Sequence, residues 1–188
     1  MTIRTPVLLA ALALVAGCAT RPAGAPAIAA IAVPADAPAA LQPAAGQEPF
    51  LEAHASGVQV YECSASADAP AAWAWKFKSP EATLTGAKGD VIGRHFGGPS
   101  WSSSDGATVV GKVAASVPSP ERGSIPWLLL AITSREGAGV LGAASSVQRL
   151  DTEGGVAPAT PCGPANAHQV ERVGYTATYV FWRAKPAA

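Results

Sequence analysis

Charge is scarce in this chain. Only 14% of its 188 residues are charged, and the 13 basic residues balance the 13 acidic ones. Lys and Arg are not gathered into a basic stripe, which argues against nucleic acid as a partner. The length suits a single domain with a substantial core.

Long apolar runs are also missing. The uncharged stretch over residues 7–16 is shorter than the roughly 20 residues that a membrane-spanning helix needs. It follows Arg4 and has the character of the apolar centre of a secretory signal peptide. No later segment is long and apolar enough to cross a membrane. We therefore predict an exported protein with a signal peptide over residues 1–17.

The end of this stretch carries the first of only three cysteines, in Leu14-Val15-Ala16-Gly17-Cys18. These residues resemble the lipobox of bacterial lipoproteins. The resemblance implies cleavage before Cys18 and a diacylglycerol on its thiol. The alternative is an ordinary signal peptide that happens to contain a cysteine. Because Ala19 follows where inner-membrane retention would favour Asp, the expected location is the outer membrane, facing the periplasm. Two or three acyl chains anchor a protein stably.

The region after Cys18 lacks the periodicity of a folded segment. Residues 19–40 are almost all Ala and Pro, with Arg21 and Asp36 as the charged exceptions. Repeated prolines block both helices and central strands. We interpret residues 18–40 as a lipidated, semi-extended tether, and residues 41–188 as the folded domain. Removing residues 1–17 takes away one basic residue, Arg4, so 12 basic residues face 13 acidic ones in the mature chain.

The other two cysteines, Cys63 and Cys162, belong to no C-x-x-C motif. In an oxidising compartment two thiols form a natural pair. A disulfide between them would close a loop of about 100 residues, which the chain-entropy treatment values at roughly 4.7 kcal/mol. The alternative is a reactive thiol or a metal ligand.

Strands are the predicted secondary structure, since apolar residues alternate with period two and no convincing amphipathic helix is present. Turn signals such as Asp105-Gly106 and Gly154-Gly155 separate the runs. The fold class that this spacing predicts is all-β, as one antiparallel β-sandwich or barrel. The predicted strands lie at 57–63, 73–78, 91–96, 108–117, 125–132, 146–151 and 173–181.

Seven of these stretches together resemble a family of secreted bacterial and fungal proteins known as the domain of unknown function DUF3455. The resemblance covers roughly residues 41–183 and implies a compact secreted β domain with paired cysteines. It implies no activity. The stretches, in the family's order, are GVQVYEC (57–63), WAWKFKSPEATL (73–84), IGRHFGGPSW (92–101), DGATVVGKV (105–113), IPWLLL (125–130), VQRLDTEGGVAPATPC (147–162) and YTATYVFWR (175–183).

One glycine pattern invites a cofactor interpretation. Gly137, Gly139 and Gly142 match G-x-G-x-x-G, which in dinucleotide-binding folds brings the backbone close to a pyrophosphate. Here no helix or βαβ unit follows, and no acidic residue stands about 20 positions on. A flexible glycine loop is therefore favoured, a dehydrogenase role is disfavoured, and no cofactor is predicted.

The three histidines, His54, His95 and His168, show neither H-x-H nor H-E-x-x-H spacing. Imidazoles from separate strands can still converge into a composite metal site, and the alternative is solvated or satisfied side chains. The aromatic residues are best explained as core. Trp101, beside glycines and serines, is the expected exposed exception. The candidate ligand-binding residues are therefore His95, Trp101 and His54, and neither catalytic nor metal-binding residues are assigned.

The sequence favours a non-enzymatic envelope lipoprotein that binds a small molecule, glycan or protein partner, or serves as a structural module. This hypothesis predicts an apolar groove near Trp101 and His95. The alternative is an extracytoplasmic hydrolase or metal-dependent enzyme, in which His95 would meet His54 or an acid within hydrogen-bond reach.

The lipid anchor gives the first testable prediction. Palmitate labelling in the native host should mark the wild-type chain, and Cys18→Ser should abolish the label because the acceptor sulfur is gone. Cys63→Ser serves as the control and should stay labelled. Label that persists in Cys18→Ser would contradict the anchor.

Overall fold

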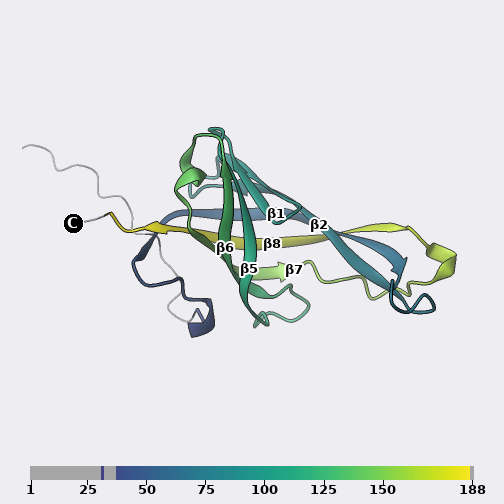
Figure 1. The fold of residues 1–188 in the computed structure, drawn as a ribbon. Coiled ribbons are helices and arrows are strands. Elements are labelled where there is room, and N and C mark those ends of the chain that lie inside the picture. Colours follow the sequence, from purple (N-terminus) through teal and green to yellow (C-terminus); the bar gives the residue numbers. More distant parts are fainter. Residues whose placement is uncertain (1–30, 32–36, 187–188) are drawn as a thin grey trace, which may run out of the picture. The chain divides into compact units, whose positions relative to one another are not determined.

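A computed structural model describes residue 31 and residues 37–186 of the chain. Its core is one antiparallel sheet closed into a barrel, in which each strand pairs with the next along the chain and the eighth pairs with the first (Figure 1). The all-β prediction is confirmed, in its barrel form. The strands are β1 (Gln47–Ala65), β2 (Trp73–Thr85), β3 (Val91–Phe96), β4 (Ser100–Ser103), β5 (Thr108–Val117), β6 (Trp127–Glu136), β7 (Ser146–Gly154) and β8 (Val170–Ala184).

The seven predicted strand segments all lie within strands or begin just before one. Two features were missed. The strand β1 begins at Gln47, ten residues before the predicted segment at Gly57, because its first half lacks a clear alternation of apolar residues. The strand β4 is short and serine-rich, so its composition resembled a loop. It forms because β3 and β5 offer it pairing partners on both sides.

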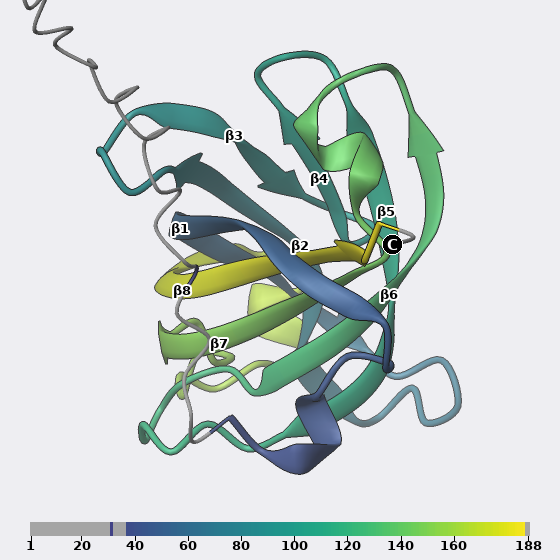
Figure 2. The ribbon, with the colours of Figure 1, turned by 90° about the vertical axis from the view of Figure 1, so that its left-hand side faces the viewer.

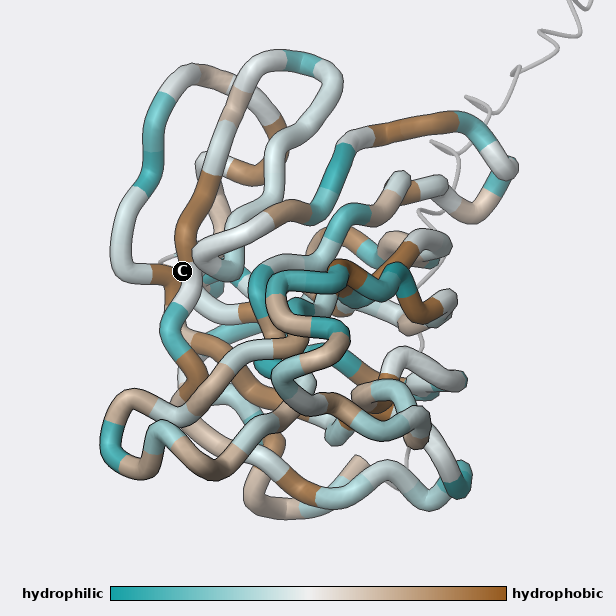
Figure 3. The backbone as a smooth tube through the Cα atoms, turned by 90° about the vertical axis from the view of Figure 1, so that its right-hand side faces the viewer, coloured by the Kyte–Doolittle hydropathy of each residue, from teal (hydrophilic) through white to brown (hydrophobic). Residues whose placement is uncertain are grey.

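Alternate residues of the strands face the barrel interior, as the two-residue period requires. Hydrophobic and hydrophilic residues are accordingly mixed along the strands (Figure 3). On β8, Tyr175, Ala177, Tyr179 and Phe181 all belong to the main core cluster. These residues share one face of β8, in agreement with the period-two alternation from which the strand at 173–181 was predicted.

A second, smaller cluster lies on the outer face of the wall. There Trp127 of β6, Leu150 of β7 and Val180 of β8 are covered by Leu41, which ends the 3-10 helix η1 (Ala39–Leu41). Figure 2 shows η1 outside the barrel. The carbonyl of Leu41 accepts a hydrogen bond from Nε2 of Gln148 at 2.8 Å. This cover explains why residues 127–130 are apolar on both faces.

The two ends of the barrel differ. The connections β2–β3, β4–β5 and β6–β7 share one end, here called the closed end. Leu141 of the 3-10 helix η2 (Val140–Ala143) is buried there in the core cluster. The backbone N–H of Val140 donates to Asp105 Oδ2 at 2.8 Å, and a Cβ on Gly139 would lie 2.2 Å from Asp105 Oδ1. The G-x-G-x-x-G residues thus pack a loop against the β4–β5 turn.

The opposite end, here called the open end, carries the β3–β4 and β5–β6 connections and an arm. The arm comprises the end of β1 (61–65), the start of β2 (73–77) and the β7–β8 connection (155–169), which extend beyond the barrel (Figure 1). The 3-10 helix η3 (Pro164–Asn166) lies in that connection. Among the described residues, the helices are short 3-10 turns, and none has the length and apolarity to span a bilayer.

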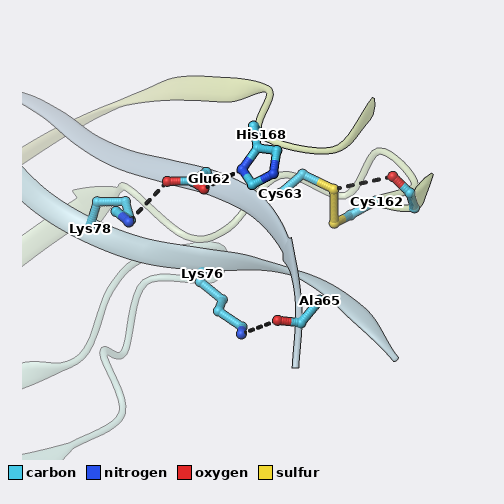
Figure 4. A network of polar contacts seen from close by, with 8 residues as sticks. Glu62, Cys63, Ala65, Lys76, Lys78, Cys162 and His168 are labelled. Atoms are coloured by element: carbon cyan, nitrogen blue, oxygen red, sulfur yellow. Dashed lines mark hydrogen bonds and ion pairs between the residues drawn. A yellow bond between two sulfur atoms is a disulfide. The ribbon is translucent and has the colours of Figure 1, made fainter. Parts of the chain in front are cut away.

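The arm is held together by the predicted disulfide, which is confirmed. The Cys63 and Cys162 sulfurs are 2.06 Å apart. Beside them Glu62 accepts from Lys78 Nζ at 2.9 Å and contacts His168 Nδ1 at 3.1 Å (Figure 4). The indole of Trp75 donates to the Thr160 carbonyl at 2.9 Å. These contacts fix the long β7–β8 connection against β1 and β2.

The disulfide generates a stability prediction. Replacing both cysteines (Cys63→Ala with Cys162→Ala) should lower the free energy of unfolding by about 2–5 kcal/mol, because the bond closes a loop of 99 residues. Urea denaturation of the oxidised wild type and of the variant measures the difference. Reduced wild type is the control and should behave like the variant. An unchanged urea midpoint in the variant would show that the bond does not stabilise the fold.

Candidate functional site

The barrel interior is not filled at its open end. A cavity of about 450 Å³ lies there, and its wall is built from all eight strands and two connections. Phe77 and Val113, 53% and 49% exposed, stand at its mouth. Its lining residues are Gln59, Tyr61, Phe77, Pro80, His95, Gly98, Pro99, Trp101, Val113, Ile125, Pro126, Leu128, Leu130, Arg149 and Tyr179.

A cluster of rings forms the inner wall. His95 of β3 and Trp101 of β4 are paired across the two strands, so their side chains share the inner face. Their rings stack 4.7 Å apart and 10° from parallel. Tyr179 of β8 meets both rings edge-on, at 5.1 Å from His95 and 5.6 Å from Trp101.

The expectation that Trp101 is exposed was wrong, because the side chain is 1% exposed. The glycines and serines around it belong to the β3–β4 turn and to the short strand β4. Pairing with His95 on β3 and Val109 on β5 turns Trp101 into the barrel. The exposed aromatic residue at the mouth is instead Phe77.

His95 is neutral at physiological pH. Burial lowers its pKa from 6.5 to about 4, because the charged form loses hydration inside the barrel. Its Nδ1 lies 2.8 Å from the carbonyl of Ser100. A carbonyl oxygen only accepts hydrogen bonds, so we assign the proton of the neutral ring to Nδ1 and an unprotonated lone pair to Nε2.

Three side chains of the wall carry buried polar atoms without a hydrogen-bond partner in the described part of the chain. They are Nε2 of Gln59, Nε1 of Trp101 and the hydroxyl of Tyr179. An unpaired buried donor destabilises a fold by about 1–3 kcal/mol. Burial also raises the pKa of Tyr179, so its hydroxyl keeps its proton. The wall thus holds unused hydrogen-bonding capacity beneath an apolar surface.

Arg149 of β7 supplies a positive charge to this wall. Its Nε and Nη2 donate to the carbonyl of Pro126 at 3.1 and 2.8 Å. The guanidinium is close enough to lower the pKa values of His95, Tyr61 and Tyr179, although burial remains the larger influence on each. Arg149 is therefore the charged side chain among the residues that line the cavity.

The other candidate residues lie elsewhere. His54 is on β1 between the buried residues Ala53 and Ala55, so it faces outward, and its Nε2 lies 3.4 Å from Glu52 Oε1. His95 faces inward, and the two histidines do not meet. His168 is in the arm beside Glu62. Among the described residues, no three His, Cys, Asp or Glu side chains are grouped as metal ligands would be. Cys18 lies outside the described residues.

Among the lining residues, His95 and Trp101 were singled out as site residues from the sequence. The polar and aromatic lining residues that were missed include Gln59, Tyr61, Arg149 and Tyr179. The two tyrosines lay on predicted strand faces, and their alternation placed them in the core. Arg149 lies between two buried residues, Gln148 and Leu150, so alternation alone did not show which neighbours point inward. Because Leu41 covers the outer face of β7, residues on both faces of this strand are buried, and the usual alternation of buried and exposed residues is lost.

Comparison with known proteins gives a family but no activity. The family model described as a protein of unknown function, DUF3455, matches residues 43–183. The chain therefore belongs to the DUF3455 family. No curated protein and no solved structure matches the chain.

The burial of His95 predicts a pH dependence of stability. Its folded-state pKa of about 4 lies below its ordinary 6.5, so the unfolded chain binds the proton more readily between these values. The stabilisation is complete above pH 6.5 and is lost as the pH falls towards 4, by about 3 kcal/mol. Urea denaturation of wild type between pH 7 and 4 should show this loss.

The matched variant for this prediction is His95→Phe, which keeps a flat ring on Trp101 and removes the titrating group. Its free energy of unfolding should depend less on pH across the same window. The carboxylates of Glu62, Glu81 and Asp105, whose pKa values are lowered by hydrogen bonds, titrate in both proteins and cancel in the difference. Parallel pH profiles for the two proteins would rule out the assigned role of His95.

Proposed function

We propose that this member of the DUF3455 family binds one small apolar molecule inside the open end of its barrel, without chemically changing it. The observation that carries this proposal is the cavity of about 450 Å³, walled by aromatic and aliphatic side chains. Small-molecule sites typically measure about 300–1,000 Å³ and combine a mostly apolar wall with a few polar groups. Eight strands also form the smallest common barrels that hold one ligand.

The unpaired polar atoms of Gln59, Trp101 and Tyr179 support the same conclusion. They lie behind the accessible surface of the wall, and small side-chain shifts would let a ligand supply the missing partners. A barrel serving only as a structural module would gain stability by filling this end with aliphatic side chains. The open end keeps both the empty volume and the unsatisfied groups.

The arrangement of titratable groups favours binding over catalysis. The geometry expected of an enzyme was a contact of His95 with His54 or with an acid. Instead His95 donates to the Ser100 carbonyl and stacks on Trp101, while His54 faces outward beside Glu52. The hypothesis of a hydrolase or metal-dependent enzyme built on these two histidines thus loses its geometric basis.

We further propose that the domain works in the bacterial cell envelope, tethered through lipidated Cys18 to the outer membrane and facing the periplasm. The support is the signal-like N-terminal sequence together with the Cys63–Cys162 disulfide. Disulfides persist in oxidising compartments such as the periplasm. The tether would leave the barrel free to take up a ligand close to the membrane surface.

A neutral fluorescent dye, N-phenyl-1-naphthylamine, tests the cavity. Titration of the full chain should give saturable fluorescence enhancement with one site. Val113→Trp should weaken dye binding at least tenfold, because the larger ring covers the mouth of the cavity. The control is Val91→Trp, at a position that is 61% exposed and does not line the cavity.

The control variant should bind the dye within about twofold of wild type, since both substitutions add the same ring to an exposed valine. Wild-type chain without saturable dye binding would contradict the proposed function. Equal weakening by both substitutions would place the dye site outside the cavity.

A further inference from the structure

We propose that Arg149 selects the ligand's head group, so that the cavity takes a small organic acid: an apolar body carrying one anionic group such as a carboxylate or sulfonate. This inference rests on the proposed function and names the substrate class of the same site. It is carried by the position of one cation in an otherwise uncharged, mostly apolar wall.

The register of the sheet puts Arg149 in that wall. On β7, Arg149 is paired with Leu128 of β6 on one side and with Tyr179 of β8 on the other. Residues paired in this way project to the same face, and all three line the cavity. The side chain is half-buried, with its guanidinium directed by two hydrogen bonds to the Pro126 carbonyl. These two hydrogen bonds use Nε and Nη2, and the guanidinium also lies close enough to the Tyr179 hydroxyl to lower the pKa of that group.

The charge of Arg149 is not neutralised by the protein. None of the ion pairs among the described residues includes it, and neither Asp nor Glu lines the cavity. His95, the other basic side chain of the wall, is neutral because its pKa is about 4. An anion entering the open end therefore meets a single uncompensated cation.

A guanidinium binds a carboxylate or sulfonate with better geometry than an ammonium group would. Arginine presents its donors in a planar fork that matches a carboxylate, and it is more weakly hydrated than lysine. Charge-assisted hydrogen bonds of this kind are shorter and stronger than neutral ones. The rings of Tyr61, Trp101 and Tyr179 would surround the apolar body of the ligand, while its acidic group faces Arg149.

Arg149 also has a structural role, because it holds the β5–β6 connection through Pro126. The test must therefore separate loss of charge from loss of wall structure. Two dyes with the same ring system do so: 1-anilinonaphthalene-8-sulfonate is an anion, and N-phenyl-1-naphthylamine is its neutral counterpart. Their affinities are measured by fluorescence titration of the full chain at low salt.

In Arg149→Gln, the affinity for the anionic dye should fall about tenfold more than the affinity for the neutral dye, which reports any change in the wall itself. Arg149→Lys keeps the charge without the fork and should recover part of the anionic affinity. In wild type, added NaCl should weaken binding of the anionic dye more than that of the neutral one, because salt screens the guanidinium.

The matched control is Arg135→Gln. Arg135 also donates two hydrogen bonds to a backbone carbonyl, that of Ala144 at 3.0 and 2.6 Å, but it does not line the cavity. The Arg135→Gln substitution should leave the affinities for both dyes unchanged. Equal loss of both dyes in Arg149→Gln would overturn the head-group role and leave the proposed function standing. Wild type that binds neither dye would overturn both.

Discussion

The closure of the sheet by pairing of β1 with β8 is the constraint on which the rest of the structure depends. These are the two longest strands, and their ladder runs from Gln47 opposite Ala184 to Glu62 opposite Val170. Closure leaves the barrel without an unpaired edge and makes one face of every strand an interior surface. Within the ring, the backbones of β1 and β2 also approach closely, since a Cβ on Gly57 would lie 2.1 Å from the carbonyl oxygen of Glu81.

Once the ring is closed, its interior volume is fixed. Side chains fill this volume at the closed end but leave a cavity at the open end. At the closed end, Leu141 is inserted from η2 and small residues such as Ala107 and Ala144 let the walls approach. At the open end, the ring of Tyr179 on β8 meets those of His95 on β3 and Trp101 on β4, and a cavity remains beside them. The arm extends from this same end, and its disulfide fixes the β7–β8 connection covalently to β1.

The open end is also where the structure departs most from what stability alone would favour. Buried polar atoms of Gln59, Trp101 and Tyr179 have no hydrogen-bond partner within the described ranges, and Arg149 places a charge beside apolar groups. Proteins tend to keep such locally unfavourable features at functional sites, while the rest of the fold supplies the stability. The continuous core of the closed end and the covered outer face under η1 are the stabilising parts here.

The sequence by itself determined the all-β class and the seven main strands, because alternation with period two is a local signal. It also determined the pairing of the two domain cysteines, because two thiols in an exported domain are expected to oxidise to a disulfide. It also placed His95 and Trp101 in neighbouring turn-linked segments. It did not distinguish a sandwich from a barrel, since both give the same alternation. The tertiary structure decided which faces point inward, and that turned Trp101 from an expected surface residue into part of the inner wall.

The convergence of His95, Arg149 and Tyr179 on one cavity was likewise decided only by the tertiary structure. These residues are far apart in the chain, and strand register brings them together around the ring. The outer cover provided by η1 made both faces of β6 and β7 apolar or buried, which hid the inward direction of Arg149 from any pattern in the sequence. Local periodicity fixes what each strand is, whereas closure and register fix what the strands enclose.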